Sequence, residues 1–482
     1  MTAARTTLVT LLLAALLWPG MAMAQGEEEI DEIEELPGVD EIEELPGIDE
    51  QGSPDDEIEE LESLDSVEEM GRVKERRDTK FEAEFIAHAR TYSMFGAQLT
   101  EVDGETETSD LALVIQRVRP TLDLSLSDWA RLEIAYDVIP LIGASQSVGG
   151  FAVQNVGSSA LRFFDLDANL YQPDSGTWVV KQNLDRLALR LGKPGMEVQV
   201  GRQAFNHGSA RMFPATDLFA PFGPGTIDTE FKRGIDGLRA TAALGINHEI
   251  EAYVIAHEPD MVTDPKEGKI TPEEWMYLLR WKGIFPELFD VSLFAGRSYE
   301  QPTIGFDIST DLLGAAVYAE SSARIAVREE QDTSFQATAG VEYKWRFGLS
   351  TTAEVYYNNL GSKAPFTRAL TDPSLPRQVG ELNYLGNWYA GLAAGYSWEL
   401  LSVGAGYIQN LQDGSLLLTT NVGYDFAENV AVGLGGLIPI GARASIDTST
   451  LAEDPTAPLV PEIESEFGLF PMLLFADIRL TF

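Results

Sequence analysis

The chain has 482 residues, a formal net charge of −42 at pH 7 and no cysteine. A charge of this sign and size excludes nucleic acid as a partner, because both molecules would be strongly negative. The absence of cysteine excludes a disulfide framework, a thiolate metal site and a lipid-modified cysteine. We therefore expect no cofactor and no metal centre.

The first 24 residues have the organisation of a secretory signal peptide. Arg5 precedes an apolar run from Leu8 to Trp18, and Ala22-Met23-Ala24 forms a small-residue cleavage site. The apolar run is shorter than the roughly 20 residues that a membrane-spanning helix needs. The sequence therefore predicts export, with residues 1–24 removed.

Residues 25–75 differ from the rest of the chain. A nine-residue unit reads DEIEELPGV from Asp31 and DEIEELPGI from Asp40, and no basic residue occurs between Gln25 and Met70. Each Pro-Gly pair ends its unit before a stable helix can form, and dense like charge cannot support a packed core. We predict a disordered, acidic, low-complexity extension in the periplasm. A docking role, in which this arm binds an envelope partner, is the alternative to a solvated spacer.

From about residue 80 the pattern becomes strictly alternating. In PTLDLSLSDWARLEIAYDVIP, apolar and polar residues alternate on both sides of the Asp128-Trp129 turn, as in strands with one apolar face. The predicted strands lie near residues 80–95, 109–126, 130–141, 181–192, 196–206, 234–244, 248–258, 273–284, 289–300, 302–310, 313–325, 334–346, 349–359, 384–398, 401–410, 415–426, 430–441 and 467–482.

These segments predict an all-β fold, a transmembrane antiparallel β-barrel of about 18 strands over residues 80–482. The predicted turns are short on one rim, whereas the loops at 142–180, 207–233, 360–383 and 442–466 on the other are long. This asymmetry and the aromatic residues near strand ends are typical of barrels in the outer membrane of Gram-negative bacteria, surrounded by lipid. A secreted protein made of several sheets is the alternative.

The last predicted strand contains LLFADIRLTF and ends at Phe482. Its alternating faces suit lipid on one side and the lumen on the other, and we expect it to close the barrel against the first strand. Phe482 resembles the aromatic terminus by which barrel assembly machinery recognises its substrates.

The residues opposite the apolar face would line a lumen. In the first third these are arginine-rich, which suits carboxylate or phosphate solutes, although the same arginines could instead pair with neighbouring carboxylates. The predicted pore-lining set is Arg117, Arg119, Arg131, Arg186, Arg190, Arg202, Gln203 and Arg239. In the second half the inner face is small, from Gly391 to Gly435, which either leaves volume open or eases curvature.

One stretch breaks the alternation. Continuing the pattern of Val198 and Val200 would point Arg202 at lipid, and a bulge at Gly201 would return it to the lumen. The next loop is rich in proline and phenylalanine, so we expect it to fold inward as a constriction rather than pack over the outer rim. The predicted constriction residues are Arg211, Asp217, Lys232 and Arg233.

The GRQ motif after an LDRLALRL strand, the following G-x-x-R and the closing RGIDGLR resemble the outer-membrane channels of the alginate-export type. The resemblance implies an 18-strand monomeric barrel for passive transport, with an arginine-lined lumen for anionic sugars. It also implies that Arg202, Gln203 and Arg239 face the lumen.

The sequence therefore predicts a passive channel for small or anionic solutes, with saccharides among the candidates. A structural or tethering barrel, whose acidic arm binds an envelope partner, is the alternative. An enzyme is not expected, because no catalytic grouping stands out around the four histidines, of which only His207 adjoins the apolar loop.

Overall fold

The structure is a computed structural model that describes residues 81–143, 161–164, 166, 169–173, 178–256, 275–329, 331–366, 384–446 and 461–482. The predicted signal peptide (1–24) and acidic extension (25–75) lie outside the described residues. No helix in the described ranges is long and apolar enough to cross a membrane.

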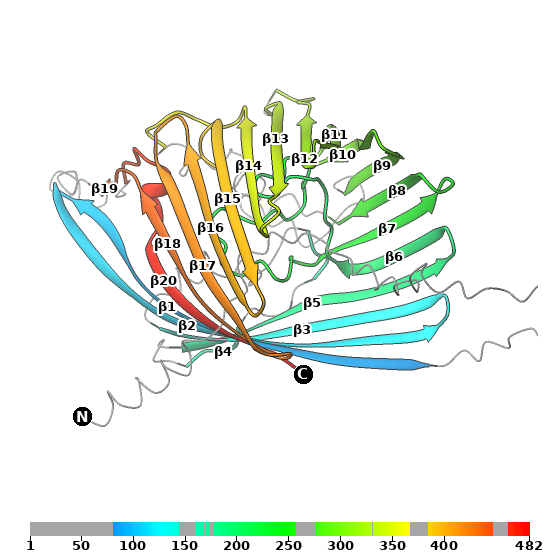
Figure 1. Cartoon of the computed structure of the whole chain (residues 1–482), viewed down its shortest axis with the longest axis horizontal. Coiled ribbons are helices and arrows are strands. Elements are labelled where there is room, and N and C mark those ends of the chain that lie inside the picture. Colours follow the sequence, from blue (N-terminus) through cyan, green and yellow to red (C-terminus); the bar gives the residue numbers. More distant parts are fainter. Residues whose placement is uncertain are drawn as a thin grey trace, which may run out of the picture.

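The described residues form a closed antiparallel β-barrel (Figure 1). Its sheet has 20 strands, of which two are three-residue additions, β4 (Asn169–Tyr171) and β19 (Ala444–Ile446), which leaves 18 strands in the wall. The wall strands are β1 (Glu82–Val102), β2 (Glu105–Ser127), β3 (Ala130–Gly143), β5 (Trp178–Lys193), β6 (Met196–Gln203), β7 (Ile235–Ala243), β8 (His248–Ile255), β9 (Met276–Phe285), β10 (Phe289–Ser298), β11 (Gln301–Leu312), β12 (Ala315–Arg324), β13 (Ser334–Lys344), β14 (Leu349–Asn358), β15 (Trp388–Trp398), β16 (Leu401–Asn410), β17 (Leu416–Ala427), β18 (Val430–Ile440) and β20 (Met472–Thr481). Each corresponds to one predicted strand, so the fold class is confirmed.

The barrel closes between β1 and β20. They pair antiparallel from His88 opposite Thr481 to Ala97 opposite Met472. Ala87 and Phe482 then exchange backbone hydrogen bonds of 3.0 and 2.9 Å. The predicted pairing of the first and last strands is confirmed, and it leaves no open sheet edge in the wall.

The wall alternates as the sequence predicts. On β14, Val355 is 47% exposed on the outer face, whereas its neighbours Glu354 and Tyr356 are buried on the inner face. This pattern is inverted relative to a water-soluble protein, because the polar side chains are buried and the apolar side chains are exposed.

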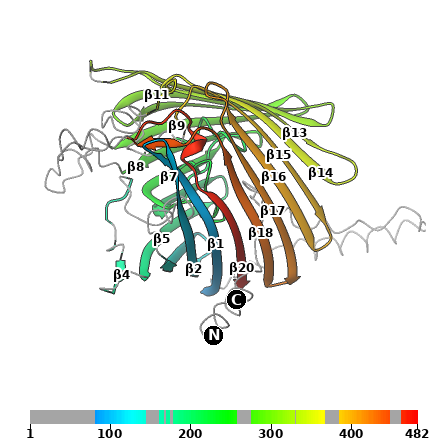
Figure 2. The ribbon, with the colours of Figure 1, turned by 90° about the vertical axis from the view of Figure 1, so that its left-hand side faces the viewer.

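The two rims differ as predicted. The turns after β2, β5, β7, β9, β11, β13, β15 and β17 are short, and the carboxyl terminus lies on the same rim, where Thr481 N donates to Asn429 O at 3.1 Å (Figure 2). We call this the short-turn rim, and the opposite one the loop rim.

The first hairpin is longer than predicted. The strands expected at 80–95 and 109–126 continue to meet at a tight turn, Asp103-Gly104, whose residues have φ of 51° and 82°. The alternation fails in this part because β20 accompanies β1 only as far as Ala97, so the hairpin tip extends beyond that strand.

Candidate functional site

Residues 204–234, between β6 and β7, lie inside the barrel; we call them the crossing segment. Figure 1 shows the segment as a green trace within the ring of strands. Its first half bonds to inner side chains of β12 and β14, and its second half to those of β1 and β2. These strands are about half the ring apart in strand order, so the segment spans the lumen.

One end of the crossing segment is held by Glu320 of β12. Its carboxylate accepts the backbone N–H groups of Ser209, Ala210 and Thr216 at 2.8, 3.1 and 3.1 Å. The segment forms no helix or sheet here, so its own carbonyl groups do not accept these N–H groups, and the Glu320 carboxylate takes that place.

Glu354 of β14 binds the next residues of the crossing segment in the same way. It accepts the backbone N–H groups of Arg211, Met212 and Phe213 at 2.6, 3.0 and 2.9 Å, and the hydroxyl of Tyr318 at 2.6 Å. Two wall carboxylates thus fix six backbone amides of the segment.

The other end is held by charge. Asp228 accepts from Nη1 of Arg117 at 2.6 Å and of Arg90 at 3.3 Å, and Glu230 accepts from Arg90 at 2.9 Å. Burial alone would raise the pKa of Asp228, but the attraction of Arg117 and Arg90 outweighs it and lowers that pKa. Asp228 is therefore a buried carboxylate anion.

Three arginines of β2 and β5, Arg117, Arg119 and Arg186, are buried and paired with carboxylates. Arg117 and Arg119 contact Asp137 at 3.3 and 3.1 Å. Asp185 lies 2.8 Å from Arg119 and 2.5 Å from Arg186. The sequence left open whether these arginines face solutes or pair with neighbouring carboxylates. The contacts of these three arginines agree with pairing.

Three further predicted pore residues lie nearer the short-turn rim. Arg131, Arg190 and Arg239 line a chamber of about 810 Å³ at that rim. Arg190 is 3.6 Å from Glu197, and Arg239 is 2.6 Å from Glu251.

Gln203 is buried and donates to the carbonyl oxygens of Gln199 and Gly237, both at 3.3 Å. Its amide therefore bonds to the backbone of the wall.

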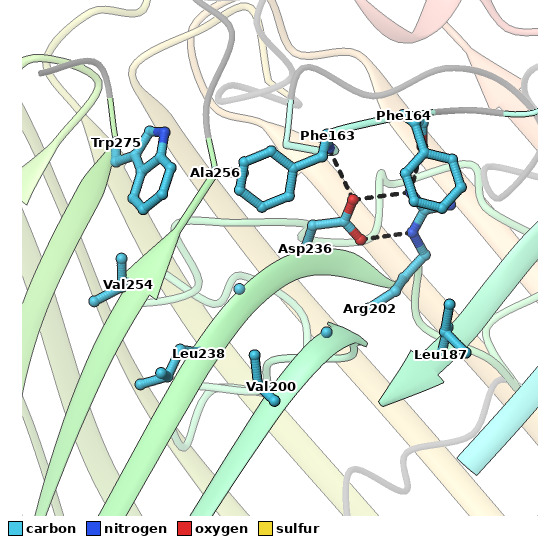
Figure 3. Close-up of a pocket in the computed structure, with 12 residues that line it drawn as sticks. Phe163, Phe164, Leu187, Val200, Arg202, Asp236, Leu238, Val254, Ala256 and Trp275 are labelled. Carbon is cyan, nitrogen blue, oxygen red and sulfur yellow. Dashed lines mark hydrogen bonds and ion pairs between the residues drawn. The ribbon is translucent and has the colours of Figure 1, made fainter. Parts of the chain in front are cut away.

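Arg202 is not in the lumen, and the predicted bulge at Gly201 is wrong. The pairing of β6 with β5 and β7 is continuous from Met196 to Gln203, so Arg202 shares the outer face of Val200. It lies beside Leu187, Val200 and Leu238 in an outward pocket of about 350 Å³ (Figure 3).

The charge of Arg202 is neutralised on this outer face. Its Nε donates to Asp236 at 2.7 Å, and Asp236 also accepts the N–H of Phe163 at 2.8 Å. The ring of Phe164 covers the guanidinium, whose carbon lies 4.9 Å from the ring centroid (Figure 3). Asp236 of this ion pair therefore accepts a backbone N–H group from the segment that contains Phe163, which is not part of a strand. This segment lies where the short strands β6 to β8 end.

The four predicted constriction residues separate in the structure. Arg211 is partly exposed, lines a cavity and lies 3.0 Å from Glu342. Asp217 and Lys232 form a buried ion pair with each other, and Lys232 also donates to the carbonyl oxygen of Phe205 at 2.6 Å. Arg233 is partly buried. Of the four, Arg211 alone lines the cavity beside the segment.

This cavity, of about 620 Å³, lies between the crossing segment and the wall of β14 to β17. The segment contributes Arg211, Met212 and Phe222, and the wall contributes small residues. The small and neutral residues that line it include Ala393, Gly395, Ser402, Gly404, Gly406, Thr419 and Asn421. A Cβ added to Gly395 would meet no atom within 4 Å, so this glycine borders open space.

Other glycines of the same wall serve close packing instead. A Cβ on Gly391 would lie 2.8 Å from Met212 and from Phe213 of the crossing segment, and one on Gly435 would lie 2.1 Å from Phe475. The open volume predicted for the glycines therefore occurs at Gly395, whereas Gly391 and Gly435 serve close packing, which the sequence did not predict.

Glu466 anchors a second element at the loop rim. It accepts from the hydroxyl of Tyr389, from Asn410 Nδ2 at 2.8 Å and from Leu385 N at 2.8 Å. Burial raises the pKa of Glu466 to about 7, against the opposing effect of these hydrogen bonds.

His207 is buried between the rings of Phe219 and Tyr253. Burial, followed by the nearby cations Arg280 and Lys232, lowers its pKa well below the usual value. Neither ring nitrogen has a hydrogen-bond partner among the described residues. Its surroundings are those of a packed aromatic side chain.

Sequence reasoning missed Glu320, Glu354 and Asp228, the residues that place the crossing segment. The signal available for the first two was an inward glutamate on each of two strands that also carry inward tyrosine and serine or threonine. The groups that bind these two glutamates are backbone amides, which every residue except proline has. No pattern of side chains in the sequence therefore indicates them.

No protein-family model matches the chain, and no curated protein matches it. Among solved structures, it is similar to OccAB1 of Acinetobacter baumannii, with a TM-score of 0.48, 11% identity, and coverage of 85% of this chain and 99% of that one. OccK11 (OpdR) of Pseudomonas aeruginosa gives a TM-score of 0.45 at 10% identity, covering 83% and 95% of the two chains. A BenF-like porin from Pseudomonas fluorescens Pf-5 gives 0.44 at 9% identity, covering 83% and 99%. These scores are too low to carry a functional argument, and the alginate-export resemblance stays a prediction.

Proposed function

We propose that the chain is a passive channel of the outer membrane for small polar solutes, which pass between the crossing segment and the glycine-rich wall of β15 to β17. The observation that supports this path is the cavity of about 620 Å³, which is bordered by Gly395, Gly404 and Gly406. At the depth of the crossing segment the arginine side of the lumen contains buried ion pairs such as Arg117 with Asp137, and the chamber of about 810 Å³ on that side lies at the short-turn rim.

The outer surface supports the membrane location. On β15 the outward residues run from Trp388 through Leu392 to Tyr396 and Trp398, so that aromatic rings lie at both ends of an apolar face. Ten residues of a tilted strand cover roughly 25 Å of height, which equals the apolar band of outer-membrane barrels.

The balance of charge argues against strong anion selectivity. Arg90, Arg117 and Arg119 lie within 3.3 Å of carboxylate groups of the same chain, so they contribute little net field to a passing solute. Two charged residues, Arg211 and Lys344, are among those that line the cavity, and Arg211 lies 3.0 Å from Glu342. We propose that neutral solutes, saccharides among them, pass as readily as anions.

Recording of the purified chain in planar bilayers tests this proposal. We expect discrete conductance steps in KCl, a permeability ratio of K⁺ to Cl⁻ within a few-fold of one, and swelling of proteoliposomes in small saccharides. A chain that inserts as a folded barrel and gives neither conductance nor swelling would refute the channel.

The tethering alternative depends on residues 25–75, outside the described ranges. Deleting residues 26–72 separates the two functions. The channel predicts unchanged conductance in the deletion variant, whereas the tether predicts loss of envelope attachment.

A further inference from the structure

The pocket of about 350 Å³ that contains Arg202 opens on the outer face of the barrel, away from the lumen (Figure 3). On one side it is lined by outward apolar side chains of strands, among them Leu187, Val200 and Leu238. On the other side it is lined by aromatic rings of residues outside the strands, Phe163, Phe164 and Trp275. The rings of Phe163 and Trp275 meet edge to face, with centroids 5.6 Å apart. Its volume falls within the range of ligand sites, about 300–1,000 Å³.

The pocket lies at the depth of the hydrocarbon layer. Strand β6 has only eight residues, from Met196 at the short-turn rim to Gln203. Because a tilted strand rises roughly 2.5 Å per residue, the end of β6 lies about 20 Å above that rim, within the apolar band of roughly 25 Å. A pocket that opens at this depth adjoins lipid chains and not water, so its occupant is apolar.

The charged residues that line the pocket are bonded within the chain. Arg202 and Asp236 are both buried. Nε and Nη2 of Arg202 donate to the carboxylate of Asp236 at 2.7 and 2.9 Å, and Nη1 donates to the carbonyl oxygen of Leu184 at 2.9 Å. Nη2 also donates to the carbonyl oxygen of Phe164, whose ring covers the guanidinium. This guanidinium is therefore not available to the phosphate or carboxylate of a ligand.

We propose that this outer pocket is a binding site for one acyl chain of a membrane lipid. The surrounding lipid is itself apolar, so the chain is held by van der Waals contact with pocket walls on several sides and not by escape from water. A chain in the pocket is therefore retained longer than a chain that lies against the outer face of β6 nearer the short-turn rim. The site lies outside the lumen, so its occupation does not depend on conductance.

The test is native mass spectrometry of the detergent-solubilised full barrel supplied with dioleoyl phosphatidylethanolamine. Val200→Trp places an indole in the pocket. Val198→Trp is the matched control, because Val198 is on the same strand and the same outer face but does not line the pocket. Both variants carry the same change in side-chain size, so a general effect of tryptophan on lipid contact is equal in the two.

The wild type and Val198→Trp should each keep one lipid at the collision energy that removes all others. The retained fraction should be at least fivefold lower in Val200→Trp. Equal retention in the two variants, or no retained lipid on the wild type, would overturn the proposal.

Dioleoyl phosphatidylglycerol shows which part of the lipid is bound, because it has the same acyl chains and an anionic head group. The guanidinium of Arg202 is already bonded, so retention of the two lipids should agree within about twofold. A fivefold preference for phosphatidylglycerol would assign the site to the head group and overturn the acyl-chain proposal.

Leu238→Trp supplies the test if Val200→Trp does not fold, because it fills the pocket from the neighbouring strand β7. Its control is Ala242→Trp, on the outer face of the same strand but outside the pocket. The same fivefold difference is expected, and equal retention would contradict the proposal. A barrel that conducts no ions would refute the channel and leave this comparison of lipid retention intact, so the two failures are distinguishable.

Discussion

Asp228 Oδ2 lies 2.6 Å from Nη1 of Arg117, a residue 111 positions earlier in the chain. This contact fixes one end of the crossing segment to β2, and the carboxylates of Glu320 and Glu354 fix the other end to β12 and β14. The segment is therefore attached to opposite walls, and it separates a side with buried arginine–carboxylate pairs from the side that contains the cavity of about 620 Å³.

Glu354→Ala should loosen the crossing segment. It leaves the amides of Arg211, Met212 and Phe213 without their acceptor, and each unsatisfied buried donor costs about 1–3 kcal/mol. Trypsin cleavage after Arg211 should accelerate at least tenfold, as followed by mass spectrometry. Glu342→Gln, which removes only the partly exposed partner of Arg211, should change the rate little. Equal rates for the wild type and Glu354→Ala would contradict the anchoring role.

Gly395→Leu should reduce single-channel conductance by half or more. Gly395 faces open space in the cavity, so a leucine there would enter the path directly. Ala390→Leu on the outer face of the same strand is the control, and its side chain would enter lipid. Conductance that falls equally in both variants would mean that the loss comes from a disturbed wall.

Arg202 and Asp236 should behave as a buried pair on the outer face. Arg202→Met alone strands the charge of Asp236 and should lower the free energy of unfolding by about 3–5 kcal/mol. Arg202→Met with Asp236→Leu should cost clearly less than the sum of the two single variants. Guanidinium unfolding of the barrel in lipid vesicles measures both. Additive effects of the two substitutions would show that the pair is not coupled.

Glu466 should make the loop rim less stable as the pH rises. Its pKa of about 7 in the folded chain exceeds the ordinary 4.5, so the folded state holds a proton that the unfolded state releases between these values. The stabilisation is complete below about pH 4.5 and is lost as the pH rises through 7. Hydrogen exchange at the amides of Leu385 and Phe467 should quicken from pH 5 to pH 8, after correction for the intrinsic rate. Glu466→Gln should abolish this added pH dependence, and a wild-type profile that matches the variant's would contradict the assignment.

Strand positions could be predicted because each wall strand has one face toward an apolar surrounding and one toward polar groups. This requirement appears in the sequence as period two, for example around Leu132 and Ile134, and it gave all 18 wall strands. The tip of the first hairpin was missed because β20 no longer accompanies β1 there, and the side chains of Gln98 to Val102 need not alternate.

The site could be predicted only where local sequence was sufficient. The run of glycines from Gly391 indicated open volume or eased curvature; open volume occurs at Gly395, and the close packing at Gly391 was not predicted. The position of Arg202 could not be inferred, because the rule that charge avoids the outer face fails where Asp236 and Phe164 enclose it. The partners of Arg117 and Arg119 could not be predicted, because they are set by distances between strands and the sequence alone does not give these distances.

The side of the lumen through which solutes pass can be determined from the accessibility of single cysteines, because the chain has no cysteine of its own. Gly395→Cys places a thiol on the open side, and Ala135→Cys places one at a buried inward position beside Arg186 on the arginine side. A charged methanethiosulfonate reagent, added during bilayer recording, should react with Gly395→Cys and reduce its current by at least half, and should leave Ala135→Cys unchanged. Block of Ala135→Cys with no effect on Gly395→Cys would place the path on the arginine side and contradict the account.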